Sequence, residues 1–198
     1  MSRSRTGFVA GLSLALLLAG LAPAAAAGPS IGRLGIGGTG CPAGTAYAAL
    51  GGGGATLSVG FTQYRAVAGG ARSFERKACG IAIPFTAPAG KSVAIVGVTY
   101  RGRNSLPAGA KATIAAEIFF AGGNGPKVSR SFSGPTSGKF SFSTAAAAPV
   151  WSACGASFNL RIQSSIRVET AGGRVASISI RSQDVAAGLI YQLRYRSC

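Results

Sequence analysis

The chain has 198 residues, with 20 lysine or arginine side chains against four acidic ones and no histidine. A formal net charge of +16 implies attraction to anionic material, and the missing imidazole excludes Ser-His-Asp and Cys-His catalysis and histidine-ligated metal sites. Glycoside hydrolysis by the usual route needs two flanking carboxylates, which are in short supply here. We therefore expect a noncatalytic protein without a cofactor or a metal.

The first residues have the layout of a secretory signal peptide. Arg3 and Arg5 precede an uncharged run from Gly7 to Leu21, and small residues that offer A-x-A cleavage sites follow it. The run is short for a membrane-spanning helix, which needs about 20 apolar residues. We predict a signal peptide over residues 1–27 and a secreted product, extracellular or periplasmic. After removal of residues 1–27, the chain keeps 18 basic and four acidic side chains, which give a net charge of +14.

A glycine-rich segment at residues 28–40 predicts a flexible leader. Over residues 41–198, short apolar runs alternate with turn residues, which predicts a single β-rich domain. The first such run, TLSVGFTQY, has Leu57, Val59 and Phe61 on one face, as in a half-buried strand.

The middle of the chain continues the strand pattern. In CGIAIPFTAP, Pro84 indicates an edge position or a bulge. The run KSVAIVGVTY at residues 91–100 is apolar at both alternations, as expected of a strand covered on both faces. Beyond it, Gly102 predicts a turn, and Pro107 and Gly109 a stop. The alanines of AKATIAAEIFF would also suit a helix, but Ile114, Ile118 and Phe120 stand at even spacing, so we predict a strand. KFSFS adds one more strand.

The last third alternates most clearly, in SFNLRIQSSIRVE, RVASISIRS and LIYQLRYRS. Its predicted inward side chains are Phe158, Leu160, Ile162, Ile166, Val168, Ala176, Ile178, Ile180, Leu189, Tyr191, Leu193 and Tyr195. Directly paired residues of a sheet point the same way, and the inward residues of the first two runs are all even-numbered. A hairpin between these runs therefore needs a loop with an odd number of residues, and Ala171-Gly172-Gly173 is predicted as that loop. If all three runs form a meander, five arginines share one outer sheet face: Arg161, Arg167, Arg181, Arg194 and Arg196.

About ten short strands with frequent turns predict an all-β fold, an antiparallel sandwich that is jelly-roll-like or a related barrel. Four cysteines in an exported chain predict two disulfides, for which three connectivities exist. We favour Cys41–Cys79 with Cys154–Cys198, because each pair joins neighbouring parts of the chain.

Eight short pieces occur in order along the chain: GCPAGTA at 40–46, ERKAC at 75–79, TYRGRNSLPAGA at 99–110, IFFAGG at 118–123, FSGP at 132–135, WSACG at 151–155, SIRV at 165–168 and YRSC at 195–198. Together they resemble a family of small secreted bacterial and fungal proteins known as domain of unknown function 4360. The resemblance implies a secreted, disulfide-bonded β-domain and no particular activity. An aspartate common in that family is Thr99 here, and an asparagine is Ala78.

The candidate binding residues form two groups. Tyr100, Arg101 and Arg103 combine an aromatic ring with cations beside a predicted loop, although turn architecture alone also accounts for them. The five outward arginines form the second group, which a merely solvated sheet face also explains. Glu117, on an apolar strand, needs a cationic partner, and we expect Arg101 or Arg103 across a hairpin. Trp151, beside a disulfide, is expected in the core; if exposed, it would stack on sugar.

We expect a secreted noncatalytic binding or cell-envelope-associated protein whose basic sheet face contacts an anionic polysaccharide, an envelope polymer or another polyanion. One alternative is a structural or protein-interaction module in which the charge is incidental. Another is a carbohydrate-active domain, which a pocket joining Glu117 or Asp184 to exposed aromatic rings would favour. The sequence holds no specific nucleic-acid motif, and no segment after the signal peptide is long and apolar enough to span a bilayer.

Overall fold

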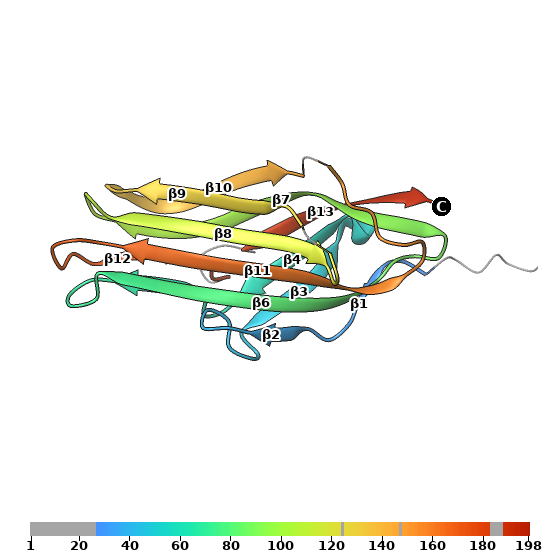
Figure 1. Ribbon diagram of the computed structural model, residues 1–198, viewed down its shortest axis with the longest axis horizontal. Coiled ribbons are helices and arrows are strands. Elements are labelled where there is room, and N and C mark those ends of the chain that lie inside the picture. Colours follow the sequence, from blue (N-terminus) through green and yellow to red (C-terminus); the bar gives the residue numbers. More distant parts are fainter. Residues whose placement is uncertain (1–26, 124, 147, 183–187) are drawn as a thin grey trace, which may run out of the picture.

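The computed structural model describes residues 27–198 apart from residues 124, 147 and 183–187. The predicted signal peptide therefore lies outside the described residues except at its last position, and Asp184 lies outside them too. The described chain forms two antiparallel sheets packed face to face (Figure 1). This confirms the predicted all-β sandwich.

The first sheet, sheet A, has the strand order β1-β6-β11-β8-β9, and β2 also pairs with β6. Its strands are β1 (Ser30–Ile31), β2 (Gly35–Gly37), β6 (Phe74–Thr86), β8 (Lys111–Phe120), β9 (Lys127–Ser133) and β11 (Ser157–Glu169). The strand β11 pairs with β6 on one side and with β8 on the other, so it lies at the centre of the sheet.

The second sheet, sheet B, has the order β3-β4-β13-β7-β12-β5, and β10 also pairs with β7. Its strands are β3 (Ala46–Gly51), β4 (Thr56–Phe61), β5 (Arg65–Ala68), β7 (Lys91–Leu106), β10 (Thr136–Ala145), β12 (Ala176–Ser179) and β13 (Leu189–Ser197). The long strand β7 pairs with β13 along its first part, with β12 near its end and with β10 on its other side.

The core lies between the two sheets and consists of the alternate side chains that the sequence predicts. Each apolar side chain withdrawn from water there contributes about 1.5–3 kcal/mol of burial free energy. Of the predicted inward set in the last three runs, all but two half-buried members are fully buried: Leu160, Ile162, Ile166, Val168, Ala176, Ile178, Ile180, Leu189, Tyr191 and Leu193. The half-buried members, Phe158 and Tyr195, pack against the same core.

The predicted hairpin between β11 and β12, and with it the three-stranded meander, is wrong. β11 belongs to sheet A, whereas β12 and β13 belong to sheet B. The loop at residues 171–173 therefore carries the chain across the sandwich. Strands of opposite sheets face the same core, so they show the same alternation of apolar and polar residues. The alternation reports which side chains point inward but not which sheet a strand joins.

The segment predicted to be a flexible leader contains two short strands beside β6. β1 pairs with Phe85 and Thr86, and β2 pairs with Gly80 to Ala82. Between these pairings, the Pro84 carbonyl accepts a hydrogen bond from Gly32 N–H at 2.8 Å. Nitrogen and carbonyl of one residue face the same neighbour in an antiparallel sheet, so the nitrogen of Pro84, which lacks a hydrogen, faces the gap between β1 and β2.

A bulge in β7 accounts for the apolar residues at both alternations of 91–100. Ile95 pairs with Leu193 and Gly97 pairs with Gln192, which leaves Val96 as the extra residue. Inward positions are therefore odd-numbered before Val96 and even-numbered after it. The prediction of a strand covered on both faces holds at Ser92, Val93 and Ala94, which are all buried, and the outward residues from Val96 to Thr99 are half-buried.

β7 continues through Gly102 to Leu106, so the turn predicted at Gly102 is wrong. Gly102 faces the core, where the ring of Phe140 occupies the space that a Cβ atom would need. The chain turns instead at the predicted stop, where Gly109 follows Pro107 with a φ of +81°.

The two disulfides have the favoured connectivity, Cys41–Cys79 and Cys154–Cys198. The first is buried and joins the segment before β3 to β6 in the other sheet. The second is exposed and joins the segment before β11 to the end of the chain. The first disulfide therefore ties a connection to the middle of β6, and the second ties a connection to the end of β13.

Candidate binding surfaces

The five arginines predicted to share one face are divided between the two sheets, because the meander does not form. Arg161 and Arg167 are exposed on the outer face of sheet A, in β11. Arg194 and Arg196 are exposed on the outer face of sheet B, in β13. Arg181 is half-buried just after β12.

Tyr100 belongs to the core and is not exposed for recognition. Its side chain is 2% exposed, and its ring stacks on Phe142 with the centroids 4.9 Å apart. Burial raises the pKa of Tyr100 to about 12. Arg101 and Arg103, at the other alternation of β7, point away from the core on the outer face of sheet B. The predicted pair of an aromatic ring and a cation is therefore split by the strand.

The outer face of sheet B carries six cationic side chains among the described residues. Five of them, on β7, β10 and β13, we call the basic face: Arg101, Arg103, Lys139, Arg194 and Arg196. The sixth, Arg65, lies on β5, which β12 separates from β7. All three acidic residues in the described part of the chain lie in strands of sheet A. Lys139 lies directly opposite Arg103 in the pairing of β10 with β7. Like charges opposite each other destabilise a sheet, and a bound anion would remove this cost.

The basic face is a stripe along the strands. Arg196 pairs with Ser92 near one end of β7, and Arg103 lies near the other end. At about 3.3 Å per residue, the two ends are roughly 35 Å apart. A surface of this shape suits an extended polymer better than a small ion.

Amide and hydroxyl groups lie between the cations of the basic face. Gln192 Nε2 donates to Thr99 Oγ1 at 3.3 Å, and Thr99 Oγ1 shares a 2.8 Å hydrogen bond with Ser143 Oγ. Such groups both donate and accept hydrogen bonds, as sugar hydroxyls do. Thr99 is therefore an uncharged hydrogen-bonding residue among the cations of the basic face.

Trp151 covers one end of sheet B from outside instead of packing in the core. It is half-buried and forms an isolated bridge with Ala94 of β7. The guanidinium carbon of Arg196 lies 4.3 Å from the centre of its ring, a cation–π contact. One end of the basic face is therefore fixed by Trp151 next to the Cys154–Cys198 disulfide.

The outer face of sheet A is hollowed into a groove of about 510 Å³ that crosses from the segment after β2 to β9. Small residues on β6, β8 and β11 make its floor: Ala78, Gly80, Ala115 and Ser165. Polar side chains stand around them: Arg76, Glu117, Lys127, Ser129 and Gln163. The groove exists because the middle of this outer face has almost no bulky side chains.

Glu117 points into this groove, so its predicted partners, Arg101 and Arg103 in the other sheet, are wrong. Its carboxylate lies 4.0 Å from Lys127 Nζ and accepts a hydrogen bond from Gly125 N–H at 3.5 Å. The expected need for a cation is met by the neighbouring strand. Among the described residues that line the groove there is no aromatic ring, so the arrangement that favours a carbohydrate-active site is not found at Glu117.

Arg76 is a candidate that the sequence-based reasoning missed. It lies directly opposite Arg167 in the pairing of β6 with β11. Arg167 forms an ion pair with Glu169 and lies 4.9 Å from the centre of the Phe74 ring. Arg76 has no carboxylate partner in the described chain. The signal was present, because Arg76 shares its alternation with the outward residues of β6.

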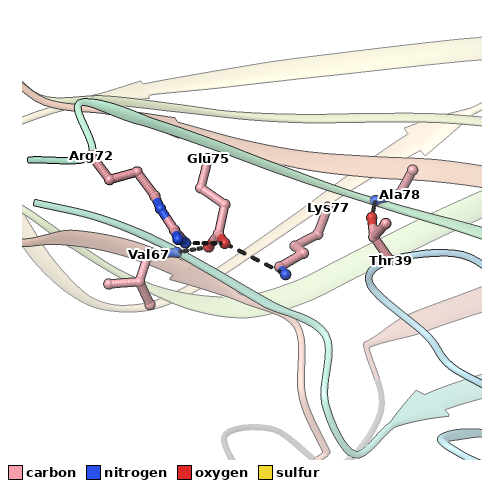
Figure 2. A network of polar contacts seen from close by, with 6 residues as sticks. All are labelled: Thr39, Val67, Arg72, Glu75, Lys77 and Ala78. Atoms are coloured by element: carbon pink, nitrogen blue, oxygen red, sulfur yellow. Dashed lines mark hydrogen bonds and ion pairs between the residues drawn. The ribbon is translucent and has the colours of Figure 1, made fainter.

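Glu75 holds a network of polar contacts where β5 approaches β6 (Figure 2). Its carboxylate accepts hydrogen bonds from Val67 N–H at 2.6 Å and Arg72 at 2.9 Å, and Lys77 Nζ lies 3.5 Å away. Burial raises the pKa of Glu75, but the Val67 hydrogen bond and the charges of Lys77 and Arg72 outweigh it and leave the pKa below its usual value. This network connects the two sheets.

A disulfide-bonded β-sandwich with cationic outer faces is the class that these features define. The chain belongs to the family described as domain of unknown function DUF4360, which matches residues 27–198. An "Uncharacterized secreted protein" of Arthroderma benhamiae is 30% identical over 168 residues, which cover 82% of this chain and 69% of the relative. In the described part of the chain, no helix has the length and apolar character needed to cross a membrane.

Two solved structures show distant likeness. TmCBM61 in complex with β-1,4-galactotriose is 14% identical with a TM-score of 0.35, covering 82% of this chain and 88% of that one. Infectious bursal disease virus, Gx strain, is 13% identical with a TM-score of 0.20, covering 91% of this chain and 42% of that one. No ligand or role follows from likeness at this level.

Proposed function

We propose that the protein is a secreted, noncatalytic binding protein whose basic face holds an anionic polysaccharide. The observation that carries the proposal is the row of five cationic side chains on sheet B, a sheet with no acidic side chain in the described part of the chain. A cationic surface attracts polyanions from a distance. The amide and hydroxyl groups between its cations then match the hydroxyls of a sugar chain.

Secretion is supported by the predicted signal peptide, by two disulfides, which persist in oxidising compartments, and by the fungal relative, which is named as a secreted protein. The absence of catalysis is supported by the absence of histidine and by the engagement of the described carboxylates. Glu75, Glu117 and Glu169 each form an ion pair, so none of the three is a free acid or base.

The test compares two variants that lose the same charge. Arg103→Gln with Arg194→Gln removes two cations of the basic face. Arg33→Gln with Arg174→Gln removes two exposed cations outside it, in the β1–β2 and β11–β12 connections. The measurement is the dissociation constant for immobilised polygalacturonate across a salt series.

We expect the basic-face variant to weaken binding at the basic face about tenfold at low salt and the control variant to bind almost as the wild type does, since each exposed charged contact contributes up to about 1 kcal/mol. Binding of the wild type should weaken steeply as salt rises. Salt-independent binding, or equal losses in both variants, would refute the proposal. Retention of one stoichiometric protein partner at high salt would instead favour the protein-interaction alternative.

A further inference from the structure

We propose that the groove of sheet A is a second site for the same anionic polysaccharide, so that one molecule bridges two polymer chains through opposite faces. This inference rests on the proposed function of the basic face. The two sheets pack face to face (Figure 1), and outward side chains of opposite sheets therefore point in opposite directions. A chain lying on the basic face cannot reach the groove without passing around a sheet edge.

The charges of the groove favour an anion at its β6 side. Glu117 is the one acidic residue among its described lining residues, and Lys127 already lies 4.0 Å from that carboxylate. Arg76 therefore remains as a cation without a carboxylate partner, and it stands directly opposite Arg167. Two opposed guanidinium groups repel each other, and Glu169 pairs with Arg167 and not with Arg76, so an anionic group placed beside Arg76 would offset the repulsion that remains.

A second cation extends the same surface along β11. Arg161 lines an adjoining hollow of about 270 Å³, which shares Gly37, Gly80 and Gln163 with the groove. Arg76 and Arg161 stand six residues apart in register, because Arg161 pairs with Ala82 of β6. At about 3.3 Å per residue, they are roughly 20 Å apart, a spacing that separated acidic groups on one polymer chain can span.

The polar groups between these cations suit sugar hydroxyls. The side chains of Ser129, Gln163 and Ser165 form no hydrogen bond within the described part of the chain, although all three line the groove. An amide and two hydroxyls supply both donors and acceptors to a ligand. The floor of Ala78 and Gly80 leaves room for a sugar ring to lie close to the backbone.

The test uses variants that lose equal charge from opposite faces. Arg76→Gln with Arg161→Gln changes the groove, Arg103→Gln with Arg194→Gln changes the basic face, and the Arg33/Arg174 double variant serves as the control. Titration calorimetry with a galacturonate oligomer too short to pass around the sheet edge gives the stoichiometry. Light scattering with long polygalacturonate reports whether chains become linked.

We expect the wild type and the control to bind two oligomers and to scatter strongly, with scattering falling again when protein is in excess. Each face variant should keep one site of wild-type affinity, and the dissociation constant of its altered site should rise at least about tenfold. The light scattering of each face variant should fall to that of unlinked polymer chains. Circular dichroism confirms that each variant is folded.

If the wild type binds a single oligomer and only the basic-face variant loses it, the proposal of a second site is refuted and the proposed function stands. If the groove variant scatters light as strongly as the wild type, the proposal that the groove helps to bridge two chains is refuted. A wild type that binds no oligomer overturns both proposals. These three results therefore separate the failure of the inference from the failure of the function on which it rests.

Discussion

The three glutamates in the described part of the chain have different surroundings and different roles. The three described acids all stand in sheet A, and each has a cation beside it. Glu75 differs from the others because the backbone N–H that donates to it belongs to Val67 of the opposite sheet, whereas Gly125, which donates to Glu117, lies in the connection between β8 and β9 of the same sheet. Its contribution is therefore structural, whereas Glu117 sets the local charge of the groove.

Replacing Glu75 with glutamine tests this structural role. The carboxylate loses a charge-assisted hydrogen bond and two cationic neighbours, so we expect the free energy of unfolding to fall by about 1–2 kcal/mol at neutral pH. The folded-state pKa of Glu75 lies below its ordinary value of 4.5, so its contribution is present above that pH and is lost as the pH falls through the folded-state pKa. Urea denaturation over a pH series measures both effects.

The control for this prediction is Glu169→Gln. That carboxylate pairs with Arg167 on the exposed outer face, where an ion pair contributes only about 0–1 kcal/mol. Equal losses in the two variants, or a Glu75→Gln deficit that stays constant into acid, would show that the network of Figure 2 does not connect the sheets as described.

At the scale of the elements, alternation of side chains predicts strands well and their partners poorly. β4, β8, β11, β12 and β13 all lie within the runs that the sequence predicts, and β10 extends beyond the predicted run KFSFS at both ends. The pairing of β11 with β6 and β8 joins strands distant in sequence, and nothing in the local pattern of SFNLRIQSSIRVE encodes that choice. Alternation with a period of two shows which side chains of a strand face the core, but it carries no information about which strands pair with it.

The bulge in β7 shows the same limit within one strand. Val96 changes the inward alternation from odd to even positions, and the sequence shows only an unbroken apolar run. Deleting Val96 should force residues 91–95 to present their opposite faces, which turns Val93 and Ile95 away from the core. We expect a loss of about 3 kcal/mol or more in the free energy of unfolding, from two displaced apolar side chains.

The matched control is Val96→Ala, which keeps the extra residue and shortens its side chain. It should cost about 1 kcal/mol or less, because Val96 is only half-buried. Chemical denaturation compares the two variants. A deletion no more harmful than the alanine variant would mean that the bulge does not set the register of β7 against β13.

For the whole molecule, the residue-level signals were enough to predict the class of fold, the inward side chains and the disulfide pairing. They were not enough to place the arginines, since the face that a side chain occupies depends on the sheet that its strand joins. Arg161 and Arg194 have the same alternation relative to the core and stand on opposite faces of the sandwich. Alternation alone marks Arg76 as outward, but the cross-strand neighbours of Arg76 and Lys139, which are Arg167 and Arg103, follow only from the strand pairing.

The central claim is that the basic face binds an anionic polysaccharide, and nuclear magnetic resonance of the arginine Nε–Hε groups tests it most directly. During titration with a galacturonate oligomer, the signals of Arg101, Arg103, Arg194 and Arg196 should shift and return when salt is added, because the contacts are electrostatic. The signals of Arg33 and Arg174 should stay in place. Shifts of equal size at all these arginines, or none on the basic face, would contradict the claim.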